Sequence, residues 1–224
     1  MPANLSIPVE ETSDTFKVSP GIGSNGGVDA LEDLLAYAMQ NTTLKDIKSQ
    51  WPEIPIFLKA TAGMRILPRA QRESIMTQVR DLLRATGFEW VCSSQARVIS
   101  GEEEGVFGWI TVNALQGRLL PGHIHSLSDT VGAMDLGGAS TQITLRPQSP
   151  DLLAGLFNLQ LGMQLDEDLY THSFLYFGQN EALRRMVQVS LYQQPGKDTV
   201  SSPCYYDGLE FDFYDPATGR NVTV

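Results

Sequence analysis

Apolar residues recur along this chain with two different spacings, and together these predict alternating helices and strands. Helical spacing of apolar residues occurs in four segments, 28–39, 71–86, 102–119 and 181–191. Short, mostly apolar runs typical of strands occur at 15–18, 54–60 and 97–100. The stretches 130–136 and 141–145 flank two glycines and predict a hairpin-like pair. Strands that alternate with helices favour an α/β architecture.

Length and charge narrow the classes of function. The chain has 224 residues, enough for one large domain or two small ones, and its 42% of hydrophobic residues can build a core. A formal net charge of −10 without a Lys/Arg stripe argues against binding to nucleic acid. A nucleotide substrate stays compatible, because a metal ion can neutralise its phosphates locally. No apolar run is long enough for a membrane span, and the N-terminus lacks the features of a signal peptide.

The cysteines, the histidines and the possible glycosylation sites give little further information about function. Cys92 and Cys204 have no CxxC partner, which argues against a zinc site, and either two buried thiols or a disulfide that involves one of them fits. His123 and His125 have the spacing of some metal sites but no acidic neighbours, so we interpret them as a surface loop. Three Asn-x-Ser/Thr triplets are compatible with a secretory route.

The segment 135–142 (Asp-Leu-Gly-Gly-Ala-Ser-Thr-Gln) carries the first candidate chemistry. An apolar strand places Asp135 at its tip, and Gly137 and Gly138 follow. Glycines let successive backbone N–H groups approach an anion, and an aspartate beside bound phosphate can hold a divalent cation or its waters. The same residues also suit a β-turn selected for its geometry. The residue types alone leave both interpretations open.

Three consecutive glutamates, 102–104, open the predicted helix at 102–119. Negative charge is favourable at a helix N-terminus, so a solvated helix start is one interpretation. Gly101 and Gly105 bracket the glutamates, and this geometry could turn one carboxylate into a cleft as a general base for water. The local sequence does not decide between the two.

Two further turns follow predicted strands. Thr61 begins the sequence Thr-Ala-Gly-Met-Arg, whose backbone and hydroxyl donors could meet an anion or simply cap a helix. The segment 21–26 (Gly-Ile-Gly-Ser-Asn-Gly) fits the glycine pattern of dinucleotide-binding folds. However, the next strand ends in Lys59-Ala-Thr and not in the acidic residue that would bind a ribose. We therefore interpret 21–26 as a glycine-rich connection.

Three of these blocks, in this order along the chain, resemble signature regions of the apyrase family, the nucleoside triphosphate diphosphohydrolases or ecto-nucleotidases. The segments 59–65, 100–113 and 132–143 resemble its second, third and fourth regions, and the similarity runs from about residue 16 to about residue 208. The resemblance implies the α/β fold shared with actin, sugar kinases and the large heat-shock chaperones. Two ribonuclease-H-like domains would then surround a nucleotide cleft, with 1–100 in the first and 101–224 in the second.

The resemblance also implies an activity and a set of site residues. The activity is Ca²⁺- or Mg²⁺-dependent hydrolysis of nucleoside tri- and diphosphates by direct attack of water. Glu104 would be the base, with Glu103 the next candidate, and Thr61 would lie near the water or the terminal phosphate. Asp135 would hold a metal-bound water. Phosphate would be gripped by Asp135, Gly137, Gly138, Ala139 and Ser140, and Ser140 and Gln142 would position the attacking water.

The chain also departs from the family pattern. The first signature region should precede residue 16 and the fifth should follow Val224, so we expect an incomplete fold that hydrolyses nucleotides poorly by itself. Tyr176 stands where the family has a cysteine, and the partner of Cys204 would lie beyond Val224. A membrane anchor would lie in termini outside the chain, and the implied location is the secretory pathway, the cell surface or the extracellular space. An exopolyphosphatase-like phosphatase and a non-catalytic nucleotide-binding relative remain alternatives.

Overall fold

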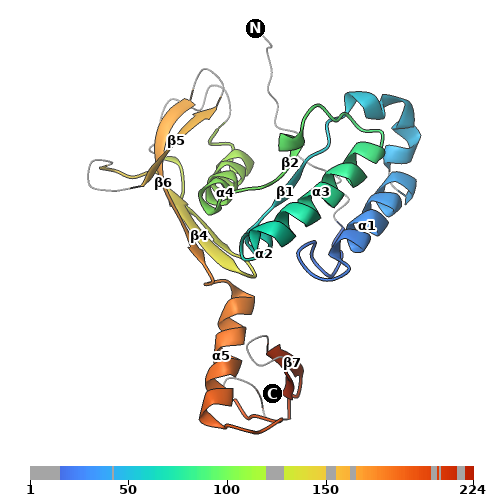
Figure 1. The fold of residues 1–224 in the computed structure, drawn as a ribbon. Coiled ribbons are helices and arrows are strands. Elements are labelled where there is room, and N and C mark those ends of the chain that lie inside the picture. Colours follow the sequence, from blue (N-terminus) through green and yellow to red (C-terminus); the bar gives the residue numbers. More distant parts are fainter. Residues whose placement is uncertain are drawn as a thin grey trace. The chain divides into compact units, whose positions relative to one another are not determined.

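The chain forms two compact units, each described here by itself (Figure 1). The computed structural model describes residues 16–41, 43–119, 129–149, 155–161, 165–202, 206, 208–215 and 220–224. Unit 1 comprises Met1–Asp135 and Gln142–Ser173, and unit 2 comprises Leu136–Thr141 and Phe174–Val224. The domain boundary expected after residue 100 stays a prediction.

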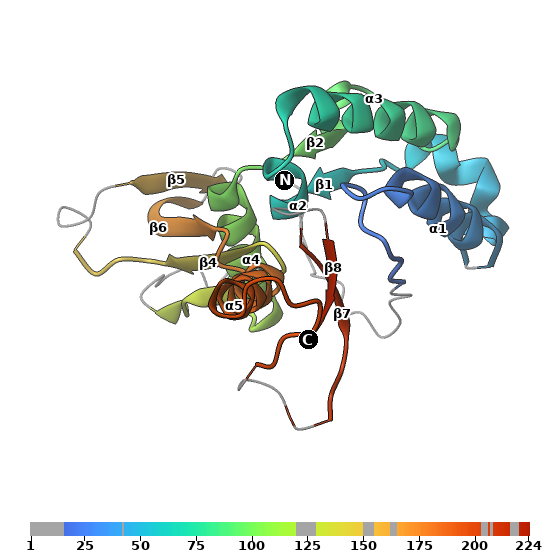
Figure 2. The ribbon, with the colours of Figure 1, turned by 60° about the horizontal axis from the view of Figure 1, so that its bottom comes forward.

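The first part of unit 1 is a small parallel sheet with helices packed on it (Figures 1 and 2). Its strands are β1 (Leu58–Ala60) and β2 (Ala96–Val98), paired in parallel. The helical segments are α1 (Gly27–Asn41), η1 (Thr43–Glu53), α2 (Ala62–Arg65), α3 (Arg69–Ala85) and η2 (Ser93–Gln95). The apolar stripe of α3 is buried against α1 and the strands, through Met76, Val79 and Leu83. Burial of this stripe is what makes the amphipathic segment helical in the folded chain.

The second part of unit 1 is helix α4 (Gly101–Leu115) against a four-stranded sheet. The strand order is β3 (Ala133–Leu136), β4 (Ser140–Leu145), β6 (Leu165–Leu175) and β5 (Leu156–Leu161). The expected hairpin-like pair corresponds to the neighbouring strands β3 and β4. Val106 and the fully buried Trp109 of α4 pack with Leu159 of β5 and Leu169 of β6.

Unit 2 has a separate apolar core. It contains α5 (Gln179–Gln193) and the antiparallel pair β7 (Asp212–Asp215) and β8 (Arg220–Thr223). The buried residues of its core are Val187, Val200, Val222 and Val224. Sheets flanked by helices confirm the α/β class predicted from the sequence.

Several expected strands and ends differ from the structure. Residues 16–18 are not a strand, and Phe16 instead packs edge-on against Tyr37 of α1. The strand expected at 54–60 is only three residues long, and before it Pro55 forms an isolated parallel bridge with Glu89 and not with β2. The helix expected to reach residue 119 ends at Leu115, and Gly117 adopts a left-handed φ of 72°.

Of the cysteines, Cys92 is described by the structure. Cys92 is an exposed free thiol in the connection before η2, so the expectation of burial is wrong for this residue. Cys204, His123 and His125 lie outside the described residues. None of the helices that the structure describes is long and apolar enough to cross a membrane.

Candidate active site

The candidate site of unit 1 begins at the carboxyl ends of β1 and β2. Because Ala60 and Val98 are paired in parallel strands, the segments that follow them emerge at the same edge of the sheet. Thr61 starts α2, and Ser100 starts α4. The exposed Thr61 hydroxyl makes no capping hydrogen bond, although its carbonyl accepts from the N–H groups of Met64 and Arg65. The starts of α2 and α4 therefore lie at the same edge of the sheet, the edge at which α/β folds usually bind ligands.

Ser100 is the N-cap residue of α4, and Glu103 completes its capping box. Ser100 Oγ accepts from the Glu103 N–H, and Glu103 Oε2 accepts in return from the Ser100 N–H, each at 3.0 Å. Arg97 Nη1 donates to Glu103 Oε2 at 2.8 Å. The Arg97 guanidinium, assisted by the Ser100 N–H, lowers the pKa of Glu103 to about 2 from an ordinary value of 4.5. Glu103 is thus engaged in holding the helix start and is not a freely solvated carboxylate.

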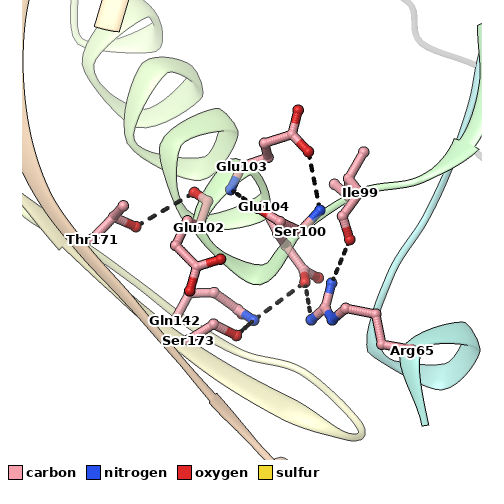
Figure 3. A network of polar contacts seen from close by, with 9 residues as sticks. All are labelled: Arg65, Ile99, Ser100, Glu102, Glu103, Glu104, Gln142, Thr171 and Ser173. Carbon is pink, nitrogen blue, oxygen red and sulfur yellow. Dashed lines mark hydrogen bonds and ion pairs between the residues drawn. The ribbon is translucent and has the colours of Figure 1, made fainter. Parts of the chain in front are cut away.

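Glu104 lies in a different environment, shown in Figure 3. Arg65 Nη2 donates to its Oε2 at 2.8 Å, and Arg65 Nη1 donates to the Ile99 carbonyl at 3.1 Å. Gln142 Nε2 donates to the same Oε2 at 3.2 Å. Only 16% of the Glu104 side chain is exposed. Within the part of the chain that the structure describes, Glu104 Oε1 accepts no hydrogen bond.

The bracketing glycines allow α4 to approach the sheet closely. A Cβ at Gly101 would lie 2.2 Å from Ser173 Oγ. A Cβ at Gly105 would lie 2.4 Å from Thr144 Oγ1 and 2.6 Å from Thr171 Oγ1. Real Cβ atoms do not tolerate these distances, so the helix could not lie here with larger residues. The two glycines therefore bring Glu104 within reach of Gln142.

Strand β4 carries an unusual row of buried polar side chains. Alternation along a strand places Ser140, Gln142 and Thr144 on one face, and each has at most 1% of its surface exposed. Thr144 and Thr171 hydroxyls bond to each other at 2.7 Å, and Gln142 Nε2 donates to Ser173 Oγ at 3.0 Å. Buried polar groups need such partners to be tolerated.

The glycine turn 137–139 belongs to unit 2, and its carbonyl groups are all engaged. They accept from the N–H groups of Gln179, Asn180 and Tyr176, each at 2.8 Å. Gly178 permits this contact, because a Cβ there would lie 2.4 Å from the Gly138 carbonyl carbon. Among the described residues, the N–H groups of Gly138 and Ala139 donate to no partner. Two neighbouring uncommitted N–H groups can bind an anion.

Asp135 is the candidate metal ligand. It is exposed on β3, and within the described residues its carboxylate has no hydrogen bond or ion pair. The described residues contain no group of three or more Asp, Glu, His or Cys side chains that could enclose an ion. A single exposed carboxylate fits a cation that keeps most of its waters and also binds substrate phosphate, which is the usual manner of Mg²⁺.

The structure therefore brings together two of the predicted site residues, Glu104 and Gln142, and adds two that the sequence did not indicate. Arg65 and Ser173 contact them directly. Arg65 lies in the 59–65 block and could have been noticed as the one cation of that block beyond the turn. Nothing in the spacing around Ser173 distinguishes it.

Comparisons with known proteins identify the family of the chain. The model of the GDA1/CD39 (nucleoside phosphatase) family matches residues 3–218. Ectonucleoside triphosphate diphosphohydrolase 5 of Ailuropoda melanoleuca is 34% identical over 92% of the chain and 48% of that protein. Nucleoside diphosphate phosphatase ENTPD5 of Homo sapiens is 34% identical over 95% of the chain and 49% of that protein.

A third relative, ectonucleoside triphosphate diphosphohydrolase 8 of Rattus norvegicus, is 39% identical over 91% of the chain and 44% of that protein. The chain thus spans about half the length of the curated relatives it matches. The mixed α/β structure is consistent with the actin-like fold of this group. With a family match over nearly all its length, the chain belongs to the GDA1/CD39 nucleoside phosphatase family.

Proposed function

We propose that this chain hydrolyses nucleoside tri- and diphosphates in a metal-dependent reaction, by attack of water on the terminal phosphate with Glu104 as base. The observation that carries the proposal is the hydrogen bond between Glu104 and Gln142, 38 residues apart in sequence. The names of the relatives, which include nucleoside triphosphate diphosphohydrolase and nucleoside diphosphate phosphatase, support the substrate class. The prefix "ecto" in several of these names favours the expected cell-surface or secretory location.

The two oxygens of Glu104 have different environments, and this difference suits a general base. Oε2 is held by Arg65 and Gln142, whereas Oε1 is the oxygen that can receive a proton. As the water oxygen bonds to the terminal phosphorus and the bond to the bridging oxygen breaks, the water proton passes to Oε1. Ser140 and Gln142 would orient that water in line with the leaving oxygen.

The phosphate-binding part of the proposal rests on the glycine turn. The N–H groups of Gly138 and Ala139 would bind the phosphate oxygens, and Gly137 allows the turn to form beside them. The Thr61 hydroxyl would reach the water or the terminal phosphate from the edge of β1. A bound Ca²⁺ or Mg²⁺ would neutralise charge on the phosphates, and Asp135 is the residue that would hold it through water.

The test compares two neighbouring glutamates. Glu104→Gln should lower the rate of phosphate release from ATP and ADP by about 100-fold or more, because it removes the proton acceptor while it keeps the side-chain shape. Glu102→Gln is the matched control and should keep the rate, because among the described residues the hydrogen bond of Glu102 to Thr171 uses its backbone carbonyl and not its carboxylate.

Phosphate release would be measured with Ca²⁺ and with Mg²⁺, using protein in excess over nucleotide so that slow turnover stays measurable. Equal rates for wild type and Glu104→Gln would refute Glu104 as the base. Release from polyphosphate but not from nucleotides would replace the proposed substrate class. Nucleotide binding without release in wild type would indicate a non-catalytic relative.

A further inference from the structure

We infer that Ser173 is a positioning residue that acts through Gln142, by fixing the orientation of the Gln142 side-chain amide beside Glu104. This role rests on the proposed function, in which Gln142 orients the attacking water. Ser173 touches neither phosphate nor water in that proposal, and its effect would reach the reaction only through the amide.

The contacts of Gln142 define which end of its amide faces Glu104. Nε2 carries two protons, and it donates to Ser173 Oγ at 3.0 Å and to Glu104 Oε2 at 3.2 Å. A carboxylate only accepts hydrogen bonds, so the atom beside it must be the nitrogen. With 1% of its surface exposed, Gln142 cannot turn its amide into solvent. Oε1 is therefore directed to the side away from Glu104, and it is buried there.

Ser173 is itself held in place by the helix that carries Glu104. It lies on β6, next to β4 in the sheet, and packs against Gly101 at the start of α4. The space of a Cβ at residue 101 is filled by Ser173, whose Cβ and Oγ would each lie 2.2 Å away. Figure 3 shows Ser173 and Gln142 directed together toward this helix start. The hydroxyl is thus immobilised by the same element that positions the proposed base.

Loss of the Ser173 hydroxyl would remove one of the acceptors that orient Nε2 and so weaken the hold on the amide. We expect Ser173→Ala to lower kcat roughly 10- to 100-fold with little change in KM, because a misplaced water reacts slowly while phosphate binding is untouched. Ser173→Thr keeps the hydroxyl and should restore most of the rate.

A double-mutant cycle separates positioning from general damage. In a Gln142→Met background, which lacks the amide, Ser173→Ala should have no further effect on kcat. If Ser173→Ala lowered kcat by the same factor in both backgrounds, Ser173 would not act through Gln142. Thr171→Val is the matched control, since the Thr171 hydroxyl also lies between β6 and α4 but bonds to Thr144 and to the Glu102 carbonyl.

A second measurement needs no turnover. In the 224-residue chain labelled with ¹⁵N-glutamine, hydrogen exchange of the Gln142 amide protons should accelerate at least about tenfold in Ser173→Ala but not in Thr171→Val. Unchanged exchange in Ser173→Ala would overturn the inference, whatever the rates show. Accelerated exchange in a chain without nucleotide hydrolysis would refute the proposed function and leave the contact between Ser173 and Gln142 standing.

Discussion

Three chemically identical side chains, Glu102, Glu103 and Glu104, have different partners at the start of α4. Glu102 contributes its backbone carbonyl to Thr171. Glu103 is bound by Arg97 and by the Ser100 N–H, whereas Glu104 meets Arg65 and Gln142. At the scale of the residue, the carboxylates of Glu103 and Glu104 therefore have different roles, although their local sequence is a run of one residue type.

The pair of Glu103 and Arg97 predicts a dependence of stability on pH. The pKa of Glu103 is lowered to about 2 in the folded chain, mainly by hydrogen bonds from Arg97. The stabilisation is therefore fully present above about pH 4.5 and is lost as the pH falls toward 2. Arg97→Gln should lower the free energy of unfolding at pH 7 by about 1–2 kcal/mol, a figure reduced for the partial exposure of the pair.

Urea unfolding of wild type and Arg97→Gln at pH 7, 4 and 3 would check this. The difference in unfolding free energy between the two proteins should shrink as the pH falls. A difference that stays constant from pH 7 to pH 3 would show that Arg97 stabilises by some means other than its pairing with Glu103.

At the scale of the element, the close packing of α4 on the sheet needs glycine at some positions of the helix and not at others. Gly105 faces Thr144 and Thr171, whereas Gly108, three residues further along the same helix, has no atom within 4 Å of its ideal Cβ position. Gly105→Ala should therefore destabilise the chain by about 1–3 kcal/mol, because the helix must move away from the sheet.

Gly108→Ala is the matched control for that substitution. It should be neutral or stabilise the chain by up to about 1 kcal/mol, because alanine is the better helix former and meets no obstacle. Thermal melting of both variants, followed by far-ultraviolet circular dichroism, provides the measurement. Equal effects at 105 and 108 would contradict the close approach of α4 to β4 and β6.

At the scale of the whole molecule, the two units have separate apolar cores. Val79 lies in a core of unit 1 and Val187 in that of unit 2, and each is fully buried. Trp51, Trp90 and Trp109 account for all three tryptophans of the chain and belong to unit 1. Tryptophan fluorescence therefore reports on unit 1.

This arrangement predicts that the units unfold in distinct steps. Val79→Ala should lower the unfolding midpoint seen by tryptophan fluorescence, at a cost of about 1–3 kcal/mol for the lost methyl groups. Val187→Ala should leave that midpoint unchanged and accelerate hydrogen exchange in α5. A shift of the fluorescence midpoint by Val187→Ala as large as that by Val79→Ala would mean that the units unfold cooperatively.

The main helices were predictable because each buries one apolar stripe, which leaves a helical period in the sequence. The segments 28–39, 71–86 and 181–191 correspond to α1, α3 and α5 within a few residues. The strand β6, the longest within the described residues, was not predicted. Polar and acidic residues are mixed with apolar ones in it, as at Asp166, Glu167 and Asp168, so the strand has no simple apolar run.

The sequence by itself determined the α/β class, the helix positions and the family, because periodicity and ordered motifs are local properties of the chain. It also marked Glu104 and Gln142 as candidates. Only the tertiary structure decided which side chains hold them. Arg65 is 39 residues from Glu104, and Ser173 is 31 residues from Gln142. Such pairs form because the parallel strands β1 and β2 bring two helix starts to the same edge of the sheet, and because Gly101 and Gly105 let α4 pack closely on β4 and β6. Contacts between residues so far apart in sequence leave no pattern in the local sequence.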